Sequence, residues 1–211
     1  MVGLLLKDIY SLNKILKQYS ISCIVFIFLS VSMKSSVYFV VMVTLMATML
    51  IFTSLSNDEM SKWDKYALTM PIARKDIVLS KYLLFTILLL SGIIVSSSIG
   101  LVMTNLMSFE STKSILITSI SFVGISCLLI SIMLPVIFKY GVEKGRILLY
   151  VVIAIPSFLA AGGVKLIEKY NFTIPTLSQV RPYLYFLPAI ILALLYISYK
   201  VSLSIYEKRE F

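Results

Sequence analysis

The chain has 211 residues, of which 59% are hydrophobic and 14% are charged, and its mean hydropathy is +0.98. A soluble globular protein needs a more polar surface than this composition supplies, so the chain is expected to be a membrane protein. The net charge of +9 is spread along the sequence, which argues against a nucleic-acid-binding protein. The chain has no histidine and no phosphate-binding loop motif, so we expect no enzyme and no catalytic, cofactor-binding or metal-binding residues.

Six stretches without Asp, Glu, Lys or Arg alternate with charged segments. Crossing the hydrocarbon core as a helix takes about 20 apolar residues, and each stretch is close to that length. We therefore expect an all-α membrane protein with six transmembrane helices in a single transmembrane domain, residues 1–211. The expected spans are 19–34, 35–56, 79–106, 114–138, 146–164 and 182–203.

Residues 1–18 precede the first span and are amphipathic, with Leu5, Ile9, Leu12 and Leu16 at helical spacing and lysines on the other side. Such a pattern predicts an N-terminal helix that lies in the membrane interface, with its lysines toward anionic lipid headgroups. The helix could serve as an anchor for the first span or contact a soluble partner, and the pattern is compatible with both.

The segment from Asn57 to Tyr82 carries nine charged residues between two long apolar stretches. Ser56 and Glu59 have the spacing of a capping box, and Pro71 cannot continue a helix. These signals predict a short amphipathic helix over residues 58–71, with Trp63 and Tyr66 on one face. A solvated connector with its aromatic side chains at headgroup level is the alternative.

Two sets of side chains within the spans are candidates for packing or binding. Small residues at four-residue spacing let two helix backbones approach closely in lipid. Methionines on one helix face form either a deformable wall for apolar substrates or ordinary packing. The packing set is Gly92, Ser96 and Gly100, and the possible substrate wall is Met42, Met46 and Met49.

The distribution of basic residues predicts the orientation in the membrane. Of the 19 basic residues, five are expected on the outer side, and the other 14 share the side of both termini. Basic residues accumulate on the cytoplasmic side, so both termini are expected to be cytoplasmic. The segment 165–181 would then lie outside, and the sequence leaves open whether it re-enters the membrane. The five outer basic residues are Lys34, Lys113, Lys165, Lys169 and Arg181.

The architecture and several short motifs resemble the membrane subunits of ABC-2-type ABC transporters, and among these the permeases of phenol-soluble modulin exporters. The motifs are Glu59, Trp63 and Tyr66, the runs 68–71, 74–78 and 80–82, and the C-terminal run 204–211. The resemblance implies a bacterial plasma-membrane permease that works with a cytoplasmic ABC ATPase subunit in two copies, which binds ATP and Mg²⁺. It also implies a second permease, identical or homologous, and membrane lipids around the pair.

In that family the helix between the second and third spans couples the permease to the ATPase. The resemblance therefore implies that residues 58–71 form a coupling helix, and that export of an amphipathic peptide is the function. Export of lipid-like or drug-like molecules, or a non-transporting sensor or assembly subunit, are the alternatives. The expected coupling residues are Asp58, Glu59, Trp63, Tyr66, Met70, Arg74 and Lys75.

Overall fold

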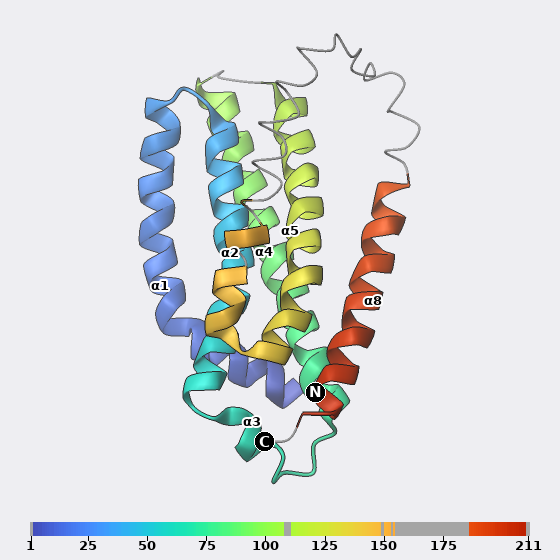
Figure 1. Cartoon of the computed structure of the whole chain (residues 1–211). Coiled ribbons are helices and arrows are strands. Elements are labelled where there is room, and N and C mark those ends of the chain that lie inside the picture. The colour runs from blue at the N-terminus through green and yellow to red at the C-terminus, as the bar shows by residue number, and fades with distance from the viewer. Residues whose placement is uncertain (1, 108–110, 149, 153, 155–185, 210–211) are drawn as a thin grey trace.

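The protein is described by a computed structural model that covers residues 2–107, 111–148, 150–152, 154 and 186–209 (Figure 1). All regular secondary structure in these residues is helical, as the sequence predicted. Residues 142–148 are helical in addition to the six labelled helices. The labelled helices are α1 (Val2–Ser32), α2 (Ser36–Met60), α3 (Trp63–Ala67), α4 (Arg74–Met107), α5 (Thr112–Tyr140) and α8 (Leu187–Glu207).

The long helices stand side by side, while the first part of α1 lies across one end of the bundle (Figure 1). Among the described residues, five helices are long and apolar enough to cross a membrane, which makes this a multi-pass membrane protein. These are α2, α4, α5, α8 and the part of α1 from Ile15 to Ser32. The short α3 and both described chain ends lie at the same end of the bundle (Figure 1), which we call the α3 end.

Two helix boundaries differ from those expected. Residues 1–18 and the first span were predicted as separate helices, but α1 continues without a break from Val2 to Ser32. The capping box at Ser56 and Glu59 was predicted to open a new helix, and this is wrong because both residues lie inside α2, which ends at Met60. The chain breaks later, where Lys62 has a positive φ of 53° before α3 begins at Trp63.

The remaining expected segments relate to the structure in different ways. The spans expected at 35–56, 79–106 and 114–138 correspond to α2, α4 and α5, which extend beyond them by up to five residues at an end. The last span, expected at 182–203, corresponds to α8, which begins at Leu187. Most of the span expected at 146–164, and the whole outer segment 165–181, lie outside the described residues.

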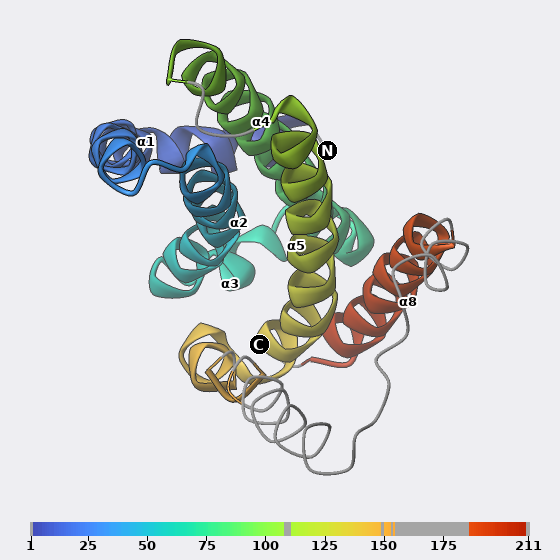
Figure 2. The same ribbon diagram turned by 90° about the horizontal axis from the view of Figure 1, so that it is seen from above.

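The core of the bundle is built around α2, which packs against α1, α4 and α5, while α8 packs against α5 and α4 (Figure 2). Gly92 of α4 lies so close to α2 that a Cβ built on it would be 2.4 Å from the Cβ of Ala47. Two buried hydroxyl pairs also tie α2 to its neighbours: Thr44 and Ser96 at 3.2 Å, and Thr48 and Ser126 at 2.9 Å. In lipid, such close packing and interhelical hydrogen bonds hold helices together.

Candidate functional site at the α3 end of the bundle

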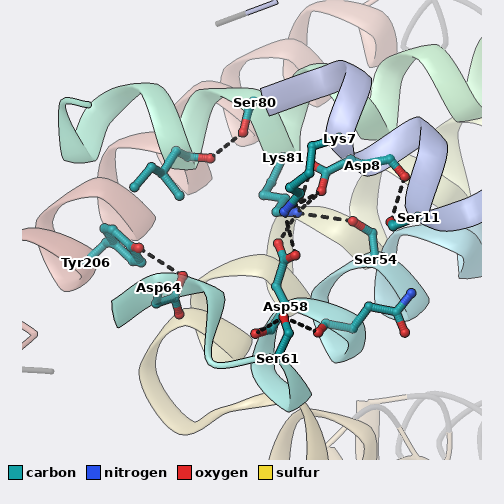
Figure 3. Close-up of polar contacts among 12 residues, drawn as sticks. Lys7, Asp8, Ser11, Ser54, Asp58, Ser61, Asp64, Ser80, Lys81 and Tyr206 are labelled. Atoms are coloured by element: carbon teal, nitrogen blue, oxygen red, sulfur yellow. Dashed lines mark hydrogen bonds and ion pairs between the residues drawn. The ribbon is translucent and has the colours of Figure 1, made fainter. Parts of the chain in front are cut away.

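Four charged residues from three helices meet at the α3 end and form what we call the ionic cluster (Figure 3). It consists of Lys7 and Asp8 of α1, Asp58 of α2 and Lys81 of α4. Two positive and two negative side chains alternate, so the cluster as a whole is neutral. Residues that are far apart in the sequence therefore fasten the crossing part of α1 to both α2 and α4.

The contacts within the ionic cluster are short and largely buried. The Lys81 Nζ lies 2.8 Å from Asp8 Oδ2 and 2.5 Å from Asp58 Oδ2, and it also donates to Ser54 Oγ at 3.1 Å. Lys7 Nζ lies 2.5 Å from Asp58 Oδ1. Only 1% of Asp8 and 3% of Lys81 is exposed. At this burial a missing partner leaves an uncompensated charge, which costs about 3–5 kcal/mol.

Lys7 links the ionic cluster to α3 through an aromatic contact. Its Nζ lies 4.3 Å from the ring centroid of Trp63, a cation–π distance, while Trp63 in turn lies 5.6 Å from the Tyr66 ring. The Tyr66 side chain remains 56% exposed, and Met60 at the end of α2 is 82% exposed. The short helix therefore presents one aromatic side chain outward and holds the other against α1.

A groove of about 350 Å³ runs between the start of α1 and the segment that follows α3. Its lining includes Lys7 of α1, Trp63 of α3, and Met70, Pro71 and Asp76 of the following segment. Pro71 lies in the loop between Ala67 and Arg74, which contains no helix. The expected helix over residues 58–71 is therefore present only as the last turn of α2 and the five residues of α3.

A second set of polar contacts ties α3 and α5 to residues 206–209, near the C-terminal end of the chain. The Tyr206 hydroxyl donates to Asp64 Oδ1 at 3.0 Å, and Arg209 Nη1 donates to the carbonyl of Phe138 at 3.2 Å (Figure 3 shows the first). Burial raises the pKa of the Asp64 carboxyl above its usual range, although the Tyr206 hydroxyl and the Arg209 charge act in the opposite direction. A small cavity of about 40 Å³ lies between Asp64, Lys81 and Arg209.

Two expected coupling residues close the ends of neighbouring helices. The Glu59 carboxylate accepts the backbone N–H of Val142 at 2.6 Å, at the start of the helical residues 142–148. A carboxylate there compensates the unpaired N–H groups of a helix N-terminus. Gly141 makes room for it, since a Cβ at this position, with φ of 86°, would lie 2.7 Å from Glu59 Oε1.

Arg74 contacts the C-terminal end of a helix, whereas Glu59 contacts an N-terminal end. Its Nη1 donates to the carbonyl of Glu207, and it lies 3.4 Å from the carbonyls of Tyr206 and Arg209. The carbonyls of Tyr206 and Glu207 belong to the C-terminal turn of α8, where a positive charge is favourable, and Arg209 follows this turn. The first residue of α4 thus fixes the last turn of α8.

The structure places the expected coupling residues in four different settings. Asp58 belongs to the ionic cluster, while Glu59 and Arg74 contact helix ends. Tyr66 and Lys75 are exposed, and the half-buried Trp63 and Met70 line the groove beside α1. The seven residues therefore do not form one face, but they all lie at or next to the α3 end.

The other sequence-derived candidates lie among the long helices. Gly92, Ser96 and Gly100 face α2, where Cβ atoms on the two glycines would meet Ala47 and Val40 at 2.4 Å and 2.9 Å. The three methionines do not line one wall. Met42 is 41% exposed, whereas Met46 and Met49 line two separate grooves on either side of α2.

Sequence reasoning missed Asp8, Lys81 and Tyr206 as members of the α3-end network. The position of Asp8 could have identified it, because it is the sole acidic residue before Asp58. A buried lysine near the N-terminal part of the chain therefore has few other carboxylates to pair with. Lys81 was counted among the basic residues on the side of both termini, and its position before the apolar stretch from Tyr82 to Phe109 did not indicate that its side chain points inward. No local signal identified Tyr206, which is fully buried against Phe138 and Asp64.

Comparison with known proteins gives the family. A model of the ABC-2 family transporter proteins matches residues 3–207, which is nearly the whole chain. Comparison with curated proteins and with solved structures found no match. Together with the bundle of membrane-spanning helices, the family match shows that the chain belongs to the ABC-2 family of transporter proteins and is a membrane permease subunit of an ABC transporter.

Proposed function

We propose that this chain is the permease of an ATP-driven exporter in the bacterial plasma membrane and that its α3 end faces the cytoplasm and receives the ATPase. The observation that carries the proposal is the position of α3, an exposed aromatic turn connected by Lys7 and Asp58 to α1, α2 and α4. An ABC transporter takes its energy from nucleotide bound on a partner subunit. Such a partner needs a docking surface that is joined to the transmembrane helices, so that its movements reach them.

The connection between α3 and the spans suggests how a movement of the ATPase would be passed on. Displacement of Trp63 shifts Lys7, and Lys7 is paired with Asp58, which is itself paired with Lys81. Each of these contacts is a buried or half-buried charge contact, so separating one costs more than moving its members together. We propose that α1, α2 and α4 respond as one unit at this end.

The arrangement of the complex follows the family pattern. We propose two ATPase subunits, each binding ATP and Mg²⁺, and a second permease that is identical or homologous to this chain. Residues 142–148 start at the α3 end, and α8 begins at the opposite end, which supports a sixth span between α5 and α8 (Figure 1). Both termini would then be cytoplasmic, in agreement with the distribution of basic residues.

For the cargo we propose amphipathic, membrane-active peptides of the phenol-soluble modulin type, on the basis of the sequence resemblance. Reconstituting the permease with its ATPase in vesicles tests this cargo: an amphipathic helical peptide should stimulate ATP hydrolysis. Stimulation by lipid-like or drug-like molecules alone would replace the peptide with that class. No stimulation by any of them would favour a non-transporting sensor or assembly subunit.

The docking role of α3 is tested by the substitution Tyr66→Ala. Truncating an anchoring tyrosine in an interface commonly costs more than about 1 kcal/mol, so we expect binding of the ATPase in a pull-down from detergent to weaken several-fold. Tyr196→Ala is the matched control, because Tyr196 is 62% exposed but lies within the apolar part of α8. Equal ATPase recovery with wild type, Tyr66→Ala and Tyr196→Ala would show that the ATPase docks elsewhere.

A further inference from the structure

A separate groove of about 240 Å³ opens between α1, α2 and the helical residues that follow α5. Among the described residues, its wall is largely apolar or aromatic and has one charged member, an arginine. No expected coupling residue lines it. The lining residues are Tyr19, Met49, Phe52, Thr53, Arg146 and Tyr150.

None of the other described residues that line this groove carries a charge that could compensate Arg146. Within the described parts of the chain, it makes no ion pair and no hydrogen bond, although Glu143 lies one turn before it. A guanidinium carries five N–H donors in a planar fork that matches a phosphate group. An unpaired arginine beside an apolar wall is therefore suited to an anionic headgroup attached to a hydrocarbon tail.

The polar groups of the groove lie at a similar depth. Arg146 follows the Glu59-bound Val142 by four residues, a rise of roughly 6 Å along an α-helix. Thr53 precedes Asp58 by five residues, a rise of roughly 8 Å, and Tyr19 lies beside Thr53 near the start of the spanning part of α1. A basic group and aromatic hydroxyls just inside the end of a bundle match the headgroup level of one leaflet.

The wall beyond these polar groups is apolar. Met49 lies one turn further along α2 from Thr53, and Phe52, which is only 6% exposed, lies beside it. Only 6% of the residues in the spanning part of α1, which borders the groove, are buried, so most of this helix faces away from the other described helices. We propose that the groove binds an anionic phospholipid of the surrounding leaflet, with its phosphate on Arg146 and an acyl chain along Met49 and Phe52.

Native mass spectrometry of the purified full-length chain tests the proposal. We expect phosphatidylglycerol to bind about fivefold more tightly than phosphatidylcholine with the same acyl chains. The attraction between one basic side chain and an anionic headgroup raises the affinity by roughly this factor. Arg146→Gln should bring the two lipids to equal affinity, and Arg146→Lys should keep most of the preference. Lys144→Gln is the matched control, because Lys144 is exposed in the same helical segment and does not line the groove.

The comparison of variants separates a specific site from general attraction. If Arg146→Gln keeps the wild-type preference, or if Lys144→Gln removes it equally, the groove does not bind the headgroup and the proposal is wrong. Competition with glycerol 1-phosphate at millimolar concentration tests whether binding requires the acyl chains, because this compound has the phosphate but no acyl chain. Failure to displace phosphatidylglycerol supports a lipid site, whereas complete displacement would identify a site for free phosphate compounds and overturn the lipid assignment.

Discussion

Lys81 is the residue on which most contacts at the α3 end converge. Its ammonium group contacts Asp8 of α1 and both Asp58 and Ser54 of α2, and it is 97% buried, at 3% exposure. Because each ammonium proton has an oxygen partner, the charge is fully compensated. The site therefore tolerates a buried ammonium group only as long as both carboxylates stay in place.

Replacing Lys81 should destabilise the protein strongly. Lys81→Met retains much of the side-chain volume but leaves Asp8 and Asp58 with Lys7 as their only cation, at a cost of about 3 kcal/mol. Thermal unfolding in detergent measures this as a lowered Tm. Lys75→Met is the control, since Lys75 is exposed on the same helix and surface substitutions usually change stability by less than about 0.5 kcal/mol. Equal Tm values for the two variants would contradict the buried ion pairs.

Sequence reasoning located the residues of this end but not their pairing. The run from Asn57 to Tyr82 was identified from its charge density, because charged residues between apolar stretches must lie at a membrane surface. The direction in which a side chain at a helix end points depends on the neighbouring helices, and these are distant in the sequence. The burial of Lys81 between α1, α2 and α4 therefore could not be predicted from the sequence.

At the scale of helices, the contact between α2 and α4 depends on side-chain size. Gly92 and Ala47 lie at the crossing, and Thr44 with Ser96 forms a hydrogen bond one turn away. The spacing of Gly92, Ser96 and Gly100 predicted a close helix contact, because only small residues let backbones approach in lipid. The partner helix could not be predicted, since α2 carries no equally clear row of small residues.

Enlarging Gly92 should separate these two helices. Gly92→Ala places a methyl group 2.4 Å from the Cβ of Ala47, and overpacking of this kind costs about 1–3 kcal/mol. The Tm in detergent should fall, and adding Ala47→Gly should restore it by returning the lost space. Gly3→Ala is the control, because no atom lies within 4 Å of a Cβ at Gly3. A Tm for Gly92→Ala that equals that of Gly3→Ala would show that the helices do not meet there.

The capping-box motif at Ser56 and Glu59 shows that a local sequence motif can indicate the wrong helix. Ser56 and Glu59 fit a capping box, but the hydrogen-bonded ladder of α2 continues through them to Met60. Glu59 caps a different helix, since its carboxylate accepts the N–H of Val142. The motif correctly identified Glu59 as a capping residue, but it pointed to the wrong helix, because the true partner, Val142, is 83 residues away.

For the whole molecule, the orientation in the membrane can be tested with one pair of residues. Lys34 and Lys62 are exposed, have nearly equal positive φ values of 51° and 53°, and flank the two ends of α2. In a background without Cys23 and Cys127, Lys34→Cys should react with a membrane-impermeant maleimide in intact cells. Lys62→Cys should react only in inverted vesicles, measured without the ATPase. The opposite pattern would place the α3 end outside.

The proposed function requires that α3 contacts the ATPase of the transporter. The most direct measurement replaces Tyr66 with the photocrosslinker p-benzoylphenylalanine in the assembled complex and identifies the crosslinked product by mass spectrometry. We predict a crosslink to the ATPase from position 66 and none from the same group at Tyr196, which is also exposed but lies in the apolar part of α8. An intact complex in which position 66 gives no crosslink to the ATPase would show that the ATPase does not dock on α3.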